Sequence, residues 1–124
     1  MIDFDNKGYI KLKGENVANG VQAVNGLLVN GEVVIGSYVS MRDRVVFTNK
    51  RIISCNVQGM TGKKVDYTSI PYSKIQCYSV ETAGVFDLDA EIELWLSGVG
   101  KVRFELSAGA DIKELCRNIS EFIL

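Results

Sequence analysis

The residue types that most often carry acid–base or nucleophilic chemistry are scarce in this chain. It contains no histidine, the commonest general base and the usual partner of a Ser or Cys nucleophile. Its cysteines, Cys55, Cys77 and Cys116, form no CxxC pair, so the spacing indicates neither a disulfide framework nor a metal site. All three lie in apolar patterns and are expected to be buried. We therefore expect no enzyme, and neither a metal nor another cofactor.

The segment GMTGKK, residues 59–64, has the glycines and lysines of a phosphate-binding loop but not their spacing. The GxxxxGK[ST] pattern would need glycine where the chain has Val57 and Ser or Thr where it has Lys64. The segment also joins two strand-like runs instead of opening a helix, where backbone amides would hold phosphate. It predicts a tight hairpin turn.

Pairs of basic residues fall at or near the predicted turns, at Arg42 with Arg44, Lys50 with Arg51, and Lys63 with Lys64. Alternate turns of a meander lie at the same end of a barrel, so some of these pairs can converge on an anion. The alternative is that they are solvated charges that protect exposed strand edges. The candidate anion-binding patch consists of Arg42, Arg44, Lys63 and Lys64.

An acidic group occupies the region before and within one later strand, comprising Glu81, Asp87, Asp89, Glu91 and Glu93. Its spacing matches no EF-hand loop. We expect a solvated face or a face between subunits.

Trp95 lies on the polar side of the same alternating strand. Aromatic side chains on polar faces are enriched at protein interfaces. Two interpretations stay open: Trp95 contacts a neighbouring subunit, or it lies beneath the N-terminal helix. A Trp open to solvent is the outcome that we expect least.

The elements that would position these residues follow from hydrophobic periodicity. Residues 17–28 have helical spacing and end at Asn30 and Gly31. From Glu32 the period changes to two, and the runs 91–96 and 101–106 form a hairpin whose acidic and basic outer faces can pair. Residues 112–123 form an amphipathic helix, with Asp111 in its first turn. The count is about seven short strands and a C-terminal helix that closes one end of a barrel or sandwich.

The bulk composition is that of one globular domain. The chain has 124 residues, of which 47% are hydrophobic and 23% charged, and its net charge is −1. This balance gives no general attraction to nucleic acid, and no segment has the ~20 apolar residues needed to cross a bilayer. A reducing, cytoplasmic location is the default expectation.

Four runs in the chain, VFTNKRII at 46–53, GMTGKK at 59–64, SIPY at 69–72 and FDLDAE at 86–91, resemble the bacterial pleckstrin-homology (PH) domain family. The resemblance covers residues 31–124 and implies a mainly β, PH-like seven-stranded antiparallel barrel capped by a C-terminal helix. Residues 1–30 would be an N-terminal helical extension. Members of the family generally have no assigned function and tend to form homo-oligomers.

The function expected from these observations is a non-catalytic, homo-oligomeric interaction or scaffold module, with itself or another protein as partner. The alternative is a binder of an anionic ligand, either a lipid headgroup or a phosphorylated metabolite, through the basic turns. Phosphoinositide binding, which is common among eukaryotic relatives, is not inferred from the fold alone.

Overall fold

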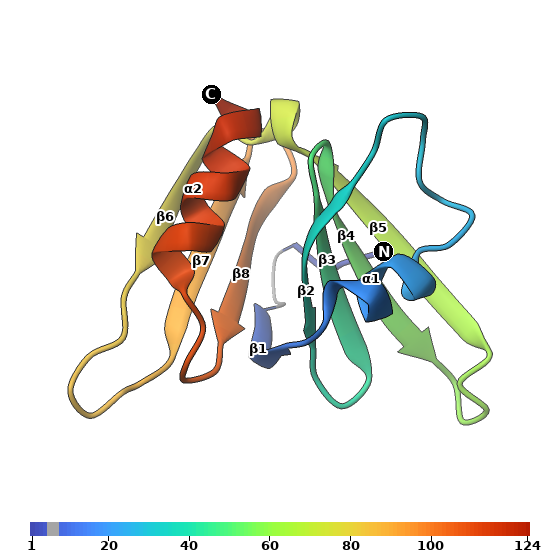
Figure 1. The fold of residues 1–124 in the computed structure, drawn as a ribbon, viewed down its shortest axis with the longest axis horizontal. Coiled ribbons are helices and arrows are strands. Elements are labelled where there is room, and N and C mark those ends of the chain that lie inside the picture. The colour runs from blue at the N-terminus through green and yellow to red at the C-terminus, as the bar shows by residue number, and fades with distance from the viewer. Residues whose placement is uncertain (5–7) are drawn as a thin grey trace.

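A single curled sheet forms most of the computed structural model, which describes residues 1–4 and 8–124 (Figure 1). Its eight strands have the order β5-β4-β3-β2-β1-β8-β7-β6. The elements in chain order are β1 (Gly8–Gly14), α1 (Val17–Ala23), β2 (Val34–Val39), β3 (Asp43–Thr48), β4 (Arg51–Gln58), β5 (Lys64–Pro71), the short 3-10 helix η1 (Tyr72–Lys74), β6 (Cys77–Glu81), β7 (Ala90–Leu96), β8 (Gly100–Leu106) and α2 (Ile112–Ile123).

The eighth strand is β1, which the sequence analysis had placed in a helical extension. It pairs antiparallel with β2 and parallel with β8, so it joins the β2–β5 half of the sheet to the β6–β8 half. The register shifts between Tyr9 and Leu12, where Lys11 has a φ of 55°. Leu12 is completely buried in the core. Segment 1–30 therefore contributes a central strand and a core side chain as well as a helix.

Helix α1 is shorter than predicted and ends at Ala23, because turns begin at Val24 and Gly26 has a φ of 87°. Asn16 caps its start, since its side chain accepts a hydrogen bond from the Ala18 amide. A Cβ atom on the buried Gly20 would lie only 2.7 Å from Ser37. Glycine at this position thus allows α1 to pack closely on β2.

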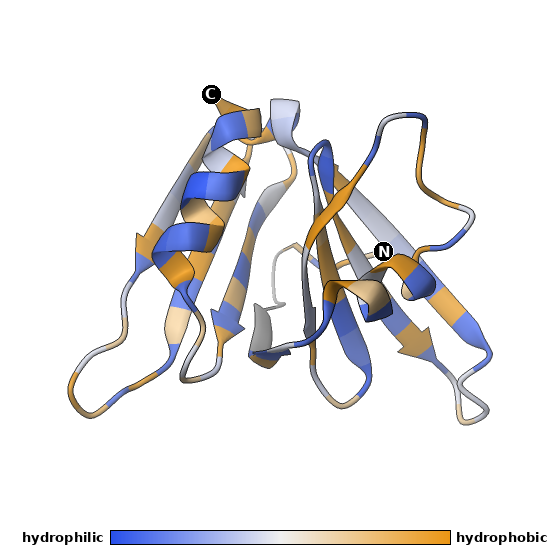
Figure 2. Cartoon of the chain, in the orientation of Figure 1, coloured by the Kyte–Doolittle hydropathy of each residue, from blue (hydrophilic) through white to orange (hydrophobic). Residues whose placement is uncertain are grey.

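Helix α2 is confirmed, with Asp111 as its N-cap. Its apolar stripe buries Ile112, Leu115 and Ile119 against the main core, and its alternating polar and apolar bands are visible in Figure 2. It packs against η1, β6 and β7. Figure 1 shows it lying along the open side of the curled sheet.

The strand pairings sort the connections into two ends of the barrel. The links 40–42, 59–63, 82–89 and 107–111 all lie at the end where β2 finishes and β3 begins, which we call the loop end (the lower end in Figure 1). The β3–β4 turn, η1 and the β7–β8 turn lie at the opposite end. No helix among the described residues is both long and apolar enough to cross a bilayer.

Candidate functional site

The two turns that carry the predicted anion-binding residues are adjacent at the loop end. The Arg42 guanidinium donates a hydrogen bond to the Gly59 carbonyl, and the Val57 amide donates to the Arg42 carbonyl at 3.2 Å. Lys63 and Lys64 are exposed on the second turn. Within residues 1–4 and 8–124, no ion pair involves the side chains of Arg42, Lys63 or Lys64.

Arg44, the fourth predicted residue, has an internal partner. Its Nε lies 2.6 Å from Glu15 Oε2, and the same oxygen accepts a hydrogen bond from Ser37 Oγ at 2.7 Å. The hydrogen bond from Arg44 lowers the pKa of the Glu15 carboxyl, against the effect of burial. This ion pair holds the connection between β1 and α1 against β2 and β3. Because Glu15 compensates its charge, Arg44 is less available to bind an anionic ligand than Arg42, Lys63 and Lys64.

A pocket of about 350 Å³ lies beside the β2–β3 turn. Arg42 and Arg44 line it, together with apolar side chains that include Val57 and Val65. Cys55 forms part of its wall, and burial raises the pKa of the Cys55 thiol to about 11. A thiol with so high a pKa stays protonated near neutral pH and is a poor nucleophile. Cys55 therefore does not supply this pocket with a reactive thiol.

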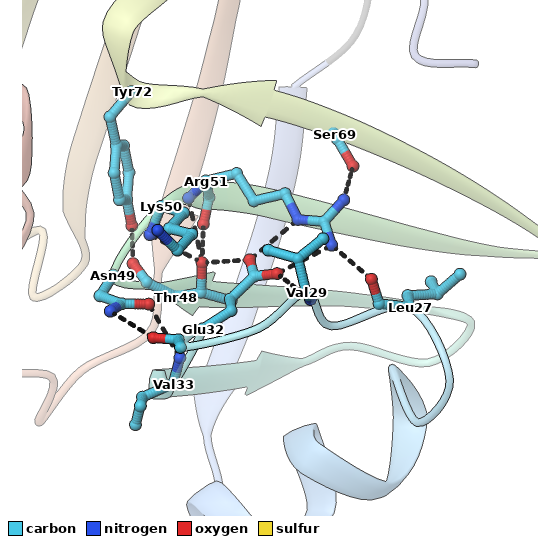
Figure 3. Close-up of polar contacts among 11 residues, drawn as sticks. Leu27, Val29, Glu32, Val33, Thr48, Asn49, Lys50, Arg51, Ser69 and Tyr72 are labelled. Atoms are coloured by element: carbon cyan, nitrogen blue, oxygen red, sulfur yellow. Dashed lines mark hydrogen bonds and ion pairs between the residues drawn. The ribbon is translucent and has the colours of Figure 1, made fainter.

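Of the basic pair Lys50 and Arg51, only the Arg51 side chain belongs to a buried polar network, at the opposite end (Figure 3); the Lys50 side chain is exposed. Arg51 Nε and Nη2 each donate to the Glu32 carboxylate at 2.9 Å, and Thr48 Oγ1 donates to it at 2.7 Å. Arg51 also binds the Leu27 carbonyl and the Ser69 hydroxyl. The Glu32 side chain is completely buried. Burial favours a raised pKa, but the hydrogen bonds from Arg51, Val29 and Thr48 lower the pKa of Glu32 to about 2.

Neighbouring residues extend this network to the backbone. Asn49 accepts a hydrogen bond from the Val33 amide at 2.8 Å and donates to the Gly31 carbonyl at 3.1 Å, while the Tyr72 hydroxyl donates to the Thr48 carbonyl at 2.6 Å. The run 48–51 of the family resemblance is thus structural: it fixes the loop between α1 and β2 to the β3–β4 turn. The sequence analysis missed Glu32, whose partner Arg51 lies 19 positions away.

Trp95 lies on the outer face of β7 and is 45% exposed. Its cross-strand neighbours are Cys77 on β6 and Lys101 on β8, and a shallow pocket of about 110 Å³ lies among them. Helix α1 packs on β2 and β3, so of the two interpretations left open, the one that placed Trp95 beneath the N-terminal helix is wrong. The interface interpretation remains a prediction.

Burial of the cysteines was predicted correctly for one of the three. Cys55 is buried, Cys116 is half-buried and Cys77 is exposed. The prediction for Cys77 is wrong because its strand lies at the edge of the sheet and the residue points to the outer face, opposite Trp95.

The acidic residues of β7 are paired along the sheet, as the hairpin prediction proposed. Glu93 lies 3.8 Å from Lys101, and Glu91 lies 3.8 Å from Arg103. Asp87 and Asp89 instead belong to the β6–β7 loop, where the Asp89 amide donates to the Asp87 carboxylate. Phe86, which precedes them, is 99% exposed. From the sequence, Asp87 and Asp89 were assigned to the acidic group, whereas Phe86 was noted only as part of a run that resembles the family.

Comparison with known proteins places this fold and its loops in a family. The model of the bacterial PH domain matches residues 4–123, which includes β1 and α1 as well as the part from residue 31 onward. The chain belongs to the bacterial PH domain family. Its PH-like barrel with a helical cap is therefore confirmed.

Two relatives of known sequence are uncharacterized proteins. The uncharacterized protein YjqA of Bacillus subtilis is 51% identical over 72 residues, which is 58% of this chain and 58% of YjqA, less than two thirds of that relative's length. The uncharacterized protein YozO of the same organism is 32% identical over 74% of this chain and 79% of its own length.

Two solved structures are similar throughout the fold. A DUF1696 family protein with a pleckstrin-homology domain from Shewanella loihica has a TM-score of 0.79 and 40% identity, over 93% of this chain and 99% of its own. A pleckstrin homology domain from Shewanella amazonensis has a TM-score of 0.66 and 40% identity, over 89% of this chain and 90% of its own.

Proposed function

We propose that this bacterial PH domain is a non-catalytic interaction module that assembles with copies of itself. The observation that carries the proposal is the half-exposed Trp95 on the outer face of β7, beside the edge strand β6. A Trp side chain offers a large apolar area with little conformational entropy to lose, so such residues often anchor interfaces.

The surroundings of Trp95 support a contact with protein. The carboxylates of Glu91 and Glu93 have partners within the sheet, so this face can be covered without burying an unpaired carboxylate of that strand. Strand β6 is the last strand in the sheet order, and in the described part of the chain it pairs only with β7. Its free edge offers backbone groups to a neighbouring chain.

The substitution Trp95→Ser tests this proposal, with native mass spectrometry and sedimentation velocity as the measurements. We expect the wild type to form a discrete multimer and Trp95→Ser to shift it to smaller species, with its circular dichroism unchanged. Val33→Ser is the control, because it removes an exposed apolar side chain from a different part of the surface. A monomeric wild type, or an unchanged multimer in Trp95→Ser, would contradict the proposal.

A second candidate function is the binding of an anionic group, such as the phosphate of a lipid headgroup or of a metabolite. The contact between Arg42 and the Gly59 carbonyl favours it, because this contact joins the two basic turns beside one pocket. The ligand would meet Arg42, Lys63 and Lys64, since Arg44 is engaged by Glu15.

A further inference from the structure

Large apolar side chains stand almost uncovered on three separate connections of the loop end. Met41 is on the β2–β3 turn and Met60 on the β4–β5 turn, and both are fully exposed. Val85 and Phe86 on the β6–β7 loop are 86% and 99% exposed. Figure 2 shows this loop as an apolar tip that extends away from the sheet. Met41 and Met60 lie on adjacent turns, and Val85 and Phe86 form a second apolar group on their own loop. Exposed apolar groups bordered by polar residues are typical of interaction surfaces.

The charges beside these apolar residues have opposite signs on two sides of the loop end. Arg42, Lys63 and Lys64 accompany Met41 and Met60, and we call residues 41–42 and 59–64 the basic turns. Two carboxylates lie near these basic side chains, but each has another partner. Asp43 accepts a hydrogen bond from Asn56, and Asp66 pairs with the Met1 amino group.

Residues 82–89, which we call the acidic loop, carry Asp87 and Asp89 beside the apolar tip. This negative charge reaches the neighbouring strand, because burial and the contact with Asp89 raise the pKa of Glu105. Both sets thus combine an apolar tip with charges of one sign, and the signs are complementary.

The sheet keeps the two sets apart within one molecule. The basic turns lie next to β5 and the acidic loop follows β6, and these strands are at opposite ends of the strand order. Figure 1 shows the acidic loop and the β4–β5 turn at opposite lower corners. A second copy related by a twofold axis perpendicular to the barrel would face this loop end with its own, and each acidic loop would lie against the other copy's basic turns. Such a contact is self-complementary, as a twofold interface requires.

We propose that two copies associate end to end in this way, with the acidic loop of each copy seated on the basic turns of the other. The pocket of about 350 Å³ beside Arg42 has an apolar wall at Val57 and Val65 and can receive the tip of the partner's loop. This contact adds a second surface to the self-assembly proposed above and does not use Trp95. An anionic membrane is the less fitting occupant, because Asp87 and Asp89 would face its negative charge.

A charge-swap experiment tests the contact in the Trp95→Ser background, where the other proposed contact is removed. One variant carries Asp87→Lys with Asp89→Lys, and the other carries Lys63→Glu with Lys64→Glu. Each variant alone places like charges in both halves of the twofold contact, so we expect its self-association to weaken more than about tenfold. A mixture of the two restores opposite charges in both halves, and we expect a mixed dimer by native mass spectrometry.

Two further variants separate the contact from effects on folding. Phe86→Ser removes only an exposed side chain, and we expect it to weaken the dimer without lowering the midpoint of urea unfolding. Lys50→Glu with Lys74→Glu changes the net charge by the same amount as Lys63→Glu with Lys64→Glu, but at the opposite end of the barrel. We expect it to leave the dimer intact.

Dimerisation that survives each charge variant and Phe86→Ser would overturn the end-to-end contact, as would failure of the two charge variants to pair with each other. Binding of the Trp95→Ser protein to phosphatidylglycerol vesicles through Phe86, without any dimer, would overturn it in favour of a membrane. The Trp95 proposal stands or falls separately, on the difference between the wild type and Trp95→Ser.

Discussion

The two ends of the barrel use similar basic turns in different ways. At the end that carries the β3–β4 turn, Arg51 is held by a buried carboxylate and by carbonyl and hydroxyl oxygens. At the loop end, as far as the described residues show, the Arg42 side chain makes one hydrogen bond, to the Gly59 carbonyl, and neither Lys63 nor Lys64 has an ion-pair partner. The difference lies in the surroundings: Glu32 is buried opposite Arg51, whereas solvent faces the lysines.

Arg44 has an intermediate position. It lies at the loop end, but Glu15 holds it to the connection between β1 and α1. A basic residue near a hairpin turn is therefore a candidate for ligand or partner binding only where no internal carboxylate reaches it. This comparison predicts large stability effects at the network of Glu32, moderate effects at Glu15, and effects on binding alone at the basic turns.

Glu32→Gln should produce the largest loss of stability. It leaves the Arg51 guanidinium partly buried without a counter-charge, a change that costs on the order of 3 kcal/mol in other proteins. The pKa leads to the same figure, because a shift from 4.5 to about 2, at about 1.4 kcal/mol for each pKa unit, corresponds to roughly 3 kcal/mol. Urea unfolding at pH 7 measures this difference.

The pH dependence of the same pair has a defined sign. Because folding lowers the pKa of Glu32, its contribution is fully present above pH 4.5 and is lost as the pH falls through about 2. The difference in unfolding free energy between the wild type and Glu32→Gln should therefore be constant from pH 7 to 5 and shrink below pH 4.5. Glu93→Gln is the control, since this carboxylate is partly exposed. A difference that stays constant down to pH 2 would show that Glu32 contributes by packing and not by charge.

Glu15→Gln should have a smaller effect, of about 1 kcal/mol, because Arg44 is 31% exposed and solvent can replace part of the lost interaction. We expect proteolysis near α1 to accelerate, since the Glu15 carboxylate joins the start of this helix to β2 and β3. Limited proteolysis with unfolding measured in parallel checks both effects. A loss as large as that of Glu32→Gln would mean that the exposure of a pair does not determine its contribution here.

The fold was largely predictable from the sequence because it depends on local periodicity. The hairpin of β7 and β8 and the helix α2 follow from apolar residues at spacings of two and of three or four. Strand β1 was missed although Ile10 and Leu12 alternate with Lys11 and Lys13. A short alternating run flanked by glycines does not indicate which strands it will pair with. Strand β1 is stabilised by hydrogen bonds to β2 and β8, which come later in the chain.

The site was less predictable because it depends on partners that are distant in sequence. Nothing local distinguishes Arg51, which meets Glu32 19 positions away, from Lys63, which pairs with no carboxylate in residues 1–4 and 8–124. Likewise, the alternation of β6 gave no indication that Cys77 would lie on the outer face of an edge strand. Which turns share a barrel end was predictable from the meander, and the contact of Arg42 with Gly59 agrees with it.

The double variant Arg42→Glu with Lys63→Glu should have the smallest effect on stability, within about 0.5 kcal/mol of the wild type, because both side chains are exposed. If the basic turns bind anions, the same variant should lose that binding. Isothermal titration with inositol hexakisphosphate as the probe, at low and high salt, measures it; added salt should weaken wild-type binding, since exposed charges are screened.

The matched control for this variant is Lys50→Glu with Lys74→Glu, which changes the net charge equally at the opposite end. Equal loss of binding in both variants would assign it to overall charge instead of the basic turns. Retained binding in the Arg42 and Lys63 variant would exclude these residues as the anion site. A large loss of stability in that variant would contradict the comparison itself, because it would mean that the unpaired charges of the loop end are structural in the same way as the Glu32 network.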